Sequence, residues 1–339
     1  MSKTIEYYTY AILGIFLFTL PLYLKSQYFI TIATFIFLYA FMTLGLRIIM
    51  KVGEVSFGYA AFMAIGAYTT ALLTTKLHLS FWVTWFIACA ITALVAFLLG
   101  SLAVRTKGVH FFLVTLAMGE TIRLIAMNWN APLLGGPQGI YGIPSPTPIT
   151  LGAFTIKFDS RVAMYFLALI ALIMVVVLIL RLDHSRIGRI WDVIGQDDRL
   201  AAVIGINVYW HKLVSFVLSS TVAGLGGVVF AHMMTYISPY DFTFFYTMQL
   251  LVYIIFGGMI TFVGPILGVT ILVVLAEALR RFGQYELIFY GFVIILVLRF
   301  IPEGVFNWIS RILIRRRQVI VGPSRGEETS HGYSEDSKP

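Results

Sequence analysis

Long apolar runs separated by short polar segments make up most of this chain. A helix needs roughly 17 to 25 residues to cross the apolar core of a bilayer, which is about 30 Å thick. Ten such runs are present, at residues 8–24, 28–46, 55–75, 81–103, 109–127, 161–180, 212–235, 246–262, 264–280 and 285–301. The pattern predicts an all-α polytopic membrane protein with about ten membrane-spanning helices.

Three segments of the sequence allow a different number of membrane-spanning helices. The third run begins beside Glu54, and a charged residue is unfavourable in the apolar core of a bilayer. The eighth and ninth runs are separated only by GGMITFVGP, so eight to ten helices fit the pattern. Residues 1–24 could also be a cleaved signal sequence, but their start is barely basic and no A-x-A site follows, which favours a membrane span.

The composition strengthens the membrane prediction. Hydrophobic residues make up 59% of the 339 residues and charged residues 12%, and the mean hydropathy is +0.90. A water-soluble fold cannot bury so much apolar surface. Cys89 is the only cysteine and lies within an apolar run, which excludes both a disulfide framework and a thiolate metal site within one chain.

The net charge of +8 is better explained by membrane topology than by nucleic-acid binding. No basic face with interleaved aromatic residues is present, so we expect no nucleic-acid partner. Ten spans place both termini on the same side, and a cytoplasmic N-terminus puts most of the 24 Lys and Arg residues in cytoplasmic segments. We therefore expect a multi-pass protein of the cell (inner) membrane with cytoplasmic N- and C-termini.

Two long loops interrupt the apolar pattern. Residues 128–160 form a predicted external loop, rich in Gly and Pro, which is either an irregular lip over a pathway or a plain connector. Residues 181–211 form a predicted cytoplasmic loop that can hold two short helices, with Asp197 as an N-cap and Gly205 as a left-handed C-cap. This second loop is either a compact knob or an amphipathic linker on the membrane surface.

The same pattern divides the chain into three parts. Residues 1–302 form the predicted transmembrane domain. Residues 303–320 place apolar side chains along one face before three arginines, which predicts an interfacial amphipathic helix in contact with membrane lipid. Residues 321–339 are polar and lack an apolar period, which predicts a disordered cytoplasmic tail.

A search for catalytic and nucleotide-binding motifs gives no candidate. The patterns GxxxxGK[ST], HExxH and GxSxG are all absent from the sequence. Asp183 and His184 lie beside basic residues, where a solvated face is favoured over a metal site. We therefore expect no enzyme activity and no metal or cofactor bound by this chain.

Small residues recur within the apolar runs. Gly58 and Gly66 belong to a run in which small residues repeat every four positions, which is typical of close helix packing in membranes. A proline and several glycines at membrane depth predict a broken or bent helix, which is tolerated only beside protein or a water-filled cavity. These glycines belong to the segment IFGGMITFVGPILG and are Gly257, Gly258, Gly264 and Gly268.

One apolar run, VTLAMGETIRLIAM, contains an acid and a base. Counting from Val109 places Glu120 roughly 16 Å along the helix, near the bilayer midplane. A lone charge there costs at least about 2.5–3.5 kcal/mol, so Glu120 and Arg123 are expected to pair on one helix face. The pair either locks this helix to its neighbours or lines a translocation path, for which Thr115 and Glu54 are further polar candidates.

Four longer motifs follow one another between about residue 36 and residue 305. They are VGEVSFGYAAFMAIGAYTTALL; RTKGVHFFLVTLAMGETIRL with LLGGPQGIYGIP; SRIGRIWDVIGQDDRLAAVIGINVYWHKLVSFVLSSTVAGLGGVVFAH; and FGGMITFVGPILGVTILVVLAEALR with YGFVIILVLRFIPEGVF. In this order they resemble the permease subunits of ATP-binding-cassette importers for branched-chain amino acids, specifically the M-type subunit of the Liv system. Relatives in that family include urea and short-chain amide permeases.

The resemblance implies a type II-importer-like permease with several partners. This chain and an H-type permease paralogue would form the pore, and two cytoplasmic ATPases would bind the ATP and Mg²⁺. A soluble periplasmic or extracellular binding protein would deliver the substrate. The implied substrate is a branched-chain amino acid, with urea or a short-chain amide as the alternative. The implied ATPase-coupling motif lies in the cytoplasmic loop and comprises Asp197, Asp198, Arg199, Ala201, Ala202 and Gly205.

The chain departs from the family pattern at three positions. Glu54 stands where Gln is common, Tyr59 where His is frequent, and Leu200 where the first Ala of the coupling motif is usual. An ion-coupled carrier with Glu120 as its relay is a remote alternative, because the two halves show only a faint Gly-rich echo instead of an inverted repeat. A channel is disfavoured because no charge ring or filter sequence is present.

Overall fold

The computed structural model describes residues 21, 26–129, 131–151, 154–156, 158, 160–259, 261–300 and 304–306. A helix forms at every predicted apolar run within this part of the chain. The helices are α2 (Gln27–Met50), α3 (Tyr59–Thr75), α4 (Phe81–Ala103), α5 (Val109–Asn128), α7 (Arg161–His184), α10 (Val208–Met234), α11 (Phe244–Gly257), α12 (Val263–Leu279) and α13 (Glu286–Phe300).

The mainly helical membrane architecture is therefore confirmed, whereas the helix count is not. Six helices among the described residues are long and apolar enough to cross a membrane: α2, α4, α5, α7, α10, and α12 together with the 3-10 turn η3 (Arg280–Tyr285). The shorter α3, α11 and α13 are apolar as well. Almost all of residues 8–24 and of residues 303–339 lie outside the described residues, so their predicted span, interfacial helix and tail stay predictions.

Two predicted boundaries were wrong for identifiable reasons. The third helix begins at Tyr59 rather than at residue 55, because the turn at Gly53 (φ +80°) is followed by non-helical backbone at residues 54–58. The eighth helix ends at Gly257 rather than at residue 262, because Gly258 has a φ of +102° that a helix cannot continue through. Gly53 follows the end of α2 and Gly258 caps α11, and Gly53 and Met259 line the same pocket.

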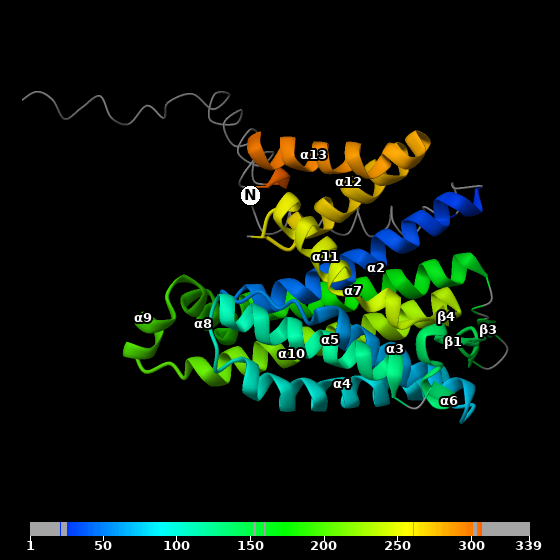
Figure 1. Cartoon of the computed structure of the whole chain (residues 1–339), viewed down its shortest axis with the longest axis horizontal. Coiled ribbons are helices and arrows are strands. Elements are labelled where there is room, and N and C mark those ends of the chain that lie inside the picture. The colour runs from blue at the N-terminus through cyan, green and yellow to red at the C-terminus, as the bar shows by residue number, and fades with distance from the viewer. Residues whose placement is uncertain are drawn as a thin grey trace, which may run out of the picture.

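The centre of the bundle is built on α10, which packs against α2, α3 and α4 (Figure 1). Gly66 of α3 allows this approach, because an added Cβ would overlap the carbonyl oxygen of Gly224 in α10. Hydroxyls of α10 also donate to backbone carbonyls of α2: Ser215 to Ile48 and Ser219 to Gly45, each at 2.9 Å. Small residues and buried hydroxyls thus replace the bulky apolar packing of a soluble core.

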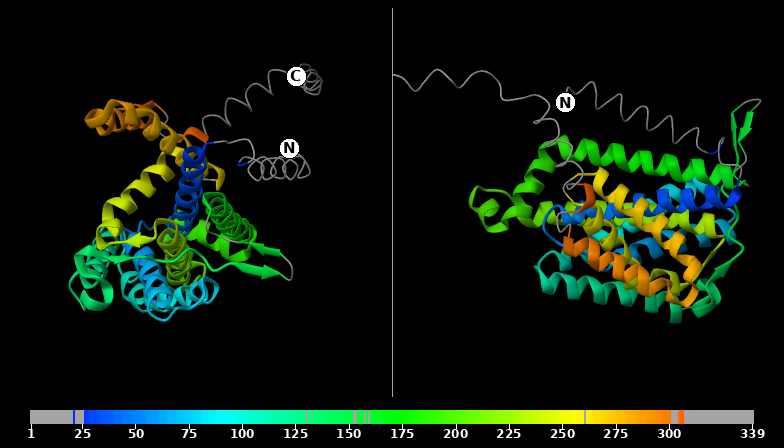
Figure 2. Two further views of the ribbon diagram at one scale, coloured as in Figure 1. Left: turned by 90° about the vertical axis from the view of Figure 1, so that its right-hand side faces the viewer. Right: turned by 90° about the horizontal axis from the view of Figure 1, so that it is seen from above.

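The chain after α10 returns to the bundle, where α11 and α12 both pack against α2. Helices α11 and α12 are antiparallel neighbours, and α12 and α13 lean away from the main bundle in the end view of Figure 2. The turn between α11 and α12 is held close by glycine, since an added Cβ at Gly257 would overlap the carbonyl oxygen of Gly264. The predicted break in the glycine-rich segment is therefore present, as a tight helical hairpin.

The predicted external loop is more ordered than its composition suggests. It contains α6 (Ala131–Leu134), the 3-10 turn η1 (Gly136–Gln138), and the strands β1 (Ile140–Tyr141), β2 (Ile149–Leu151) and β3 (Phe154–Ile156). Strand β1 pairs antiparallel with β4 (Tyr236–Ile237), which follows α10 and precedes the 3-10 turn η2 (Pro239–Phe242), and β2 pairs with β3. His232 of α10 adds a 2.7 Å contact from its Nδ1 to the carbonyl oxygen of Pro144.

At the opposite end of the bundle, two short helices project beyond the long ones. They are α8 (Arg186–Gln196) and α9 (Asp198–Val203), and they lie farthest to the left in Figure 1. The strands lie at the right-hand end of the same view. The two predicted loops thus occupy opposite ends of the molecule.

Candidate functional site

The segment 185–205, called the knob below, owes its shape to three local caps. The Ser185 hydroxyl accepts from the N–H of Gly188 at 3.0 Å and starts α8. The Asp197 carboxylate accepts from the N–H groups of Arg199 at 2.8 Å and Leu200 at 3.2 Å and starts α9. Gly205 ends α9 with a φ of +85°. The predicted N-cap and C-cap are both confirmed.

The inner face of the knob is part of the protein core. Trp191, Ile194 and Ala201 are buried there among residues of the long helices. Gly195 lies so close to the chain after α2 that an added Cβ would overlap the carbonyl oxygen of Lys51. This packing favours a compact knob over a linker that rests on the membrane surface.

The outer face of the knob carries an apolar tip, formed by Leu200, Val203 and Ile204. These side chains are 64%, 84% and 70% exposed, and they lie on α9 and directly after it, at the far end of the molecule (Figure 1). A soluble surface rarely exposes large apolar side chains side by side unless another molecule covers them. The tip extends beyond the long helices, at the end of the molecule that carries α8 and α9.

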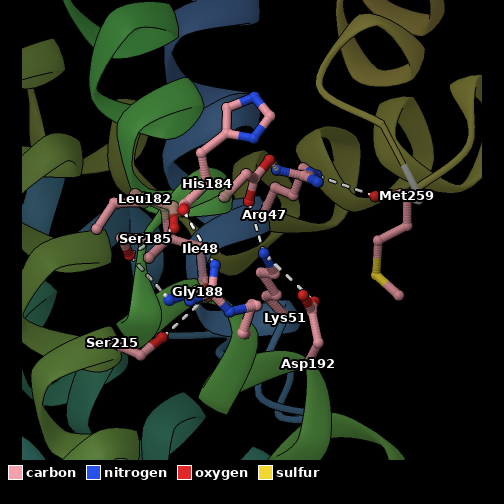
Figure 3. Close-up of polar contacts among 12 residues, drawn as sticks. Arg47, Ile48, Lys51, Leu182, His184, Ser185, Gly188, Asp192, Ser215 and Met259 are labelled. Carbon is pink, nitrogen blue, oxygen red and sulfur yellow. Dashed lines mark hydrogen bonds and ion pairs between the residues drawn. The ribbon is translucent and has the colours of Figure 1, made fainter.

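Ion pairs join the end of α2 to both α7 and α8, in an arrangement called the latch below. Asp183 of α7 accepts from Arg47 at 3.2 Å and from Lys51 at 2.6 Å. Lys51 also lies 3.3 Å from Asp192 of α8, and Arg47 donates to the carbonyl oxygen of Met259 at 2.9 Å (Figure 3). The expectation of a merely solvated face at Asp183 was wrong, because this carboxylate joins two helices.

A second ion cluster, called the inner cluster below, lies where α9 meets α10. Lys212 is 2.6 Å from Glu54 and 3.3 Å from Asp198, and Lys107 is 2.7 Å from Asp198. The hydrogen bond from Lys107 and the charge and hydrogen bond of Lys212 lower the pKa of the Asp198 carboxyl below its ordinary value. The Glu54 carboxylate also accepts from the N–H of Gly108 at 3.3 Å.

The residues predicted for a translocation path do not come together. Glu120 and Arg123 form the predicted pair at 2.7 Å, with side chains that are 32% and 18% exposed. Thr115 is buried instead against the start of α3, where its hydroxyl accepts from the N–H of Phe57 at 3.2 Å. Glu54 belongs to the inner cluster, where its partner is Lys212. The assignment of these four residues to a path or polar seam stays a prediction.

The glycines singled out in the sequence all lie at tight backbone contacts. An added Cβ at Gly58 would crowd the carbonyl oxygen of Thr115, and one at Gly268 would overlap the carbonyl oxygen of Tyr253. An added Cβ would also overlap a backbone oxygen at Gly66 (that of Gly224), at Gly257 (that of Gly264) and at Gly264 (that of Gly258). Gly258 packs beside Gly304. These glycines therefore allow close helix packing and form the tight hairpin between α11 and α12.

Sequence reasoning missed the basic members of these clusters. Lys212, Lys107 and Arg47 were counted only as topological charges, although a lysine within the first turns of an apolar helix is a signal for a buried partner. His232 was also missed; its Nε2 lies 2.8 Å from the Thr70 hydroxyl. In the described part of the chain no group of His, Cys, Asp or Glu side chains is placed to hold a metal ion.

Comparisons with known proteins identify the family. Residues 28–298 match the family described as branched-chain amino acid transport system / permease component. The high-affinity branched-chain amino acid transport system permease protein LivM of Salmonella typhimurium is 33% identical over 301 residues, which cover 83% of this chain and 71% of that protein. The Escherichia coli LivM gives the same identity and coverage. No solved structure gives a significant match.

These matches favour a transport permease over an enzyme, a channel or an ion-coupled carrier, because the family and both relatives are permease components of transport systems. The apolar helices of the structure agree with a multi-pass location in the inner membrane. The chain belongs to the family of branched-chain amino acid transport system permease components.

Proposed function

We propose that this chain is one pore-forming subunit of an ATP-driven importer of branched-chain amino acids, and that a separate ATPase docks on the knob. The observation that carries the docking proposal is the apolar tip at Leu200, Val203 and Ile204, which projects from the end of the bundle. The latch and the inner cluster support it, because they fix the knob to the long helices. A force applied to the tip would therefore move helices rather than bend a loop.

The partners follow from the energy requirement. Uphill import needs an energy source, and the sequence lacks the loop that cradles nucleotide phosphates. Two cytoplasmic ATPases would bind the ATP and Mg²⁺, and their closure would move the knob as a rigid body. An H-type paralogue would complete the pore, and a binding protein would deliver the amino acid at the end that carries β1 and β4.

The substrate proposal rests on the family and on both relatives, which are named for branched-chain amino acid transport. Such a substrate is a zwitterion with an apolar side chain, so a path needs both charges and apolar surface. Glu120 and Arg123 offer both charges on α5, and both side chains keep some exposure in the single chain. We place this pair at the face of α5 that meets the path or the paralogue.

Serine substitutions at the tip test the docking proposal. The double variant Leu200→Ser, Val203→Ser removes two exposed apolar contacts without touching the buried face of the knob. Because fully burying a Leu or Val side chain is worth about 1.5–3 kcal/mol, we expect ATPase association to weaken about tenfold or more. Co-purification of the ATPase and ATP-dependent uptake in proteoliposomes are the measurements.

Leu77→Ser is the matched control, since Leu77 is 63% exposed and follows α3 at the opposite end of the bundle. We expect this variant to keep both the ATPase and uptake. Unchanged association in the double variant at the tip would contradict docking at the knob.

A further inference from the structure

The inner cluster contains a buried acid, Glu54, whose side chain is only 4% exposed. Glu54 lies in the turn before α3, and its carboxylate is 2.6 Å from the Lys212 ammonium of α10. We propose that Glu54 and Lys212 are positioning residues for transport, which carry the movement of the knob to the start of α5. This inference rests on the proposed docking of an ATPase at the knob.

The contacts link α9 to the start of α5 by two routes. Asp198, the first residue of α9, lies 2.7 Å from the Lys107 ammonium and 3.3 Å from that of Lys212. Lys212 holds Glu54, which in turn accepts from the N–H of Gly108 at 3.3 Å. Lys107 and Gly108 directly precede α5, so both routes end at its first turn. That helix carries the Glu120–Arg123 pair farther along.

The Glu54–Lys212 pair is buried, whereas the Lys107–Asp198 pair is more exposed, and we assign the two pairs different roles for this reason. The side chains of Lys212 and Glu54 are only 5% and 4% exposed, so separating them would leave two charges in a medium of low polarity. The side chains of Lys107 and Asp198 are 63% and 20% exposed, so water can replace their contact at little cost. The buried pair is a fixed pivot, and the outer contact opens and closes around it.

The negative charge of Glu54 also balances the positive charges of the lysines in the cluster. Lys107 and Lys212 carry two positive charges, and Glu54 and Asp198 carry two negative ones, so the cluster is neutral. With Gln at position 54, Lys212 would have Asp198 as its one anionic partner in the cluster, and Asp198 would be shared between two lysines. Glu54 therefore supplies the second negative charge that balances the two lysines of the cluster.

Neutral variants of the buried pair test the inference. Removing one partner leaves a buried charge, whereas replacing both partners by neutral residues of similar size is often tolerated. We therefore expect Glu54→Gln, Lys212→Met as a double variant to insert and to bind the ATPases. Uptake of leucine per ATP hydrolysed should fall about tenfold, which is a typical size for coupling between two sites. Lys76→Met, at the exposed far end of α3, is the control.

The ratio of uptake to hydrolysis separates a positioning role from a purely structural one. A double variant that assembles and keeps the wild-type ratio would overturn the inference. If the double variant does not assemble, Lys107→Gln removes only the exposed outer contact and is measured instead. A lower ratio in Lys107→Gln supports the inference, and an unchanged ratio overturns it. A wild-type complex without ATP-driven uptake would overturn the proposed function itself.

Discussion

The Glu120–Arg123 pair is the residue-scale feature that most needs a physical explanation. Both charges lie on α5, a helix long and apolar enough to cross a membrane, and the 2.7 Å contact reduces the cost of keeping them there. The side chains are still 32% and 18% exposed, so the helices in the described part of the chain leave them partly uncovered. Under the proposed function, their remaining polar atoms would face the paralogue or a watery path.

Glu120→Gln tests which role the pair has. This variant keeps the size of the side chain but removes the negative charge, so Arg123 loses its ionic partner on α5. We expect an assembled complex whose ATPase still responds to the binding protein, with leucine uptake reduced at least about tenfold. Loss of assembly would instead assign the pair to helix locking.

Arg280→Gln is the matched control for Glu120→Gln. Arg280 pairs with Glu277 at the same three-residue spacing, at 3.3 Å, but its side chain is 68% exposed. Exposed pairs of this kind contribute about 0–1 kcal/mol. We expect neither assembly nor uptake to change in this variant.

At the scale of elements, glycines determine how closely α3 and α10 approach each other. Gly66 places α3 against the carbonyl oxygen of Gly224, and Gly227 of α10 lies against the carbonyl oxygen of Met63. In a bilayer, close backbone approach of this kind replaces the hydrophobic drive that packs helices in water. The interface leaves no room for a larger residue at position 66.

Gly66→Leu should therefore separate α3 from α10. Overpacking typically costs about 1–3 kcal/mol, and here the obstructing atom is a backbone oxygen that cannot rotate away. We expect a clear drop in the apparent melting temperature of the purified protein. Gly291→Ala in α13 is the control, since no atom lies within 4 Å of its added Cβ and alanine is the better helix former. Equal stability of the two variants would contradict this packing.

Sequence reasoning was strongest for elements whose signal is local. Apolar runs located the helices, and the Asp197 and Gly205 caps followed from one or two neighbouring residues. It was weakest where partners are far apart in the chain. Nothing adjacent to Lys212 indicates that its partner is Glu54, 158 residues away. The same holds for the latch, where Asp183 meets Lys51 across 132 residues.

At the scale of the whole molecule, the fold separates two ends joined by long helices. One end carries the knob, the latch and the inner cluster, and the other carries the paired strands and the His232 contact (Figure 1). Helices α2, α3, α5, α7 and α10 connect them. This arrangement suits a permease in which an ATPase acts at one end and a binding protein at the other.

The most direct test of the central claim is uptake by the reconstituted complex in proteoliposomes. The complex would contain this chain, its paralogue, the ATPases and the binding protein, with leucine, valine, urea and acetamide as substrates. We expect leucine and valine to enter only with ATP and the binding protein, and an uncoupler to have no effect at constant ATP. Uptake that does not depend on ATP, that is abolished by the uncoupler, or that is confined to urea and acetamide would contradict an ATP-driven importer of branched-chain amino acids.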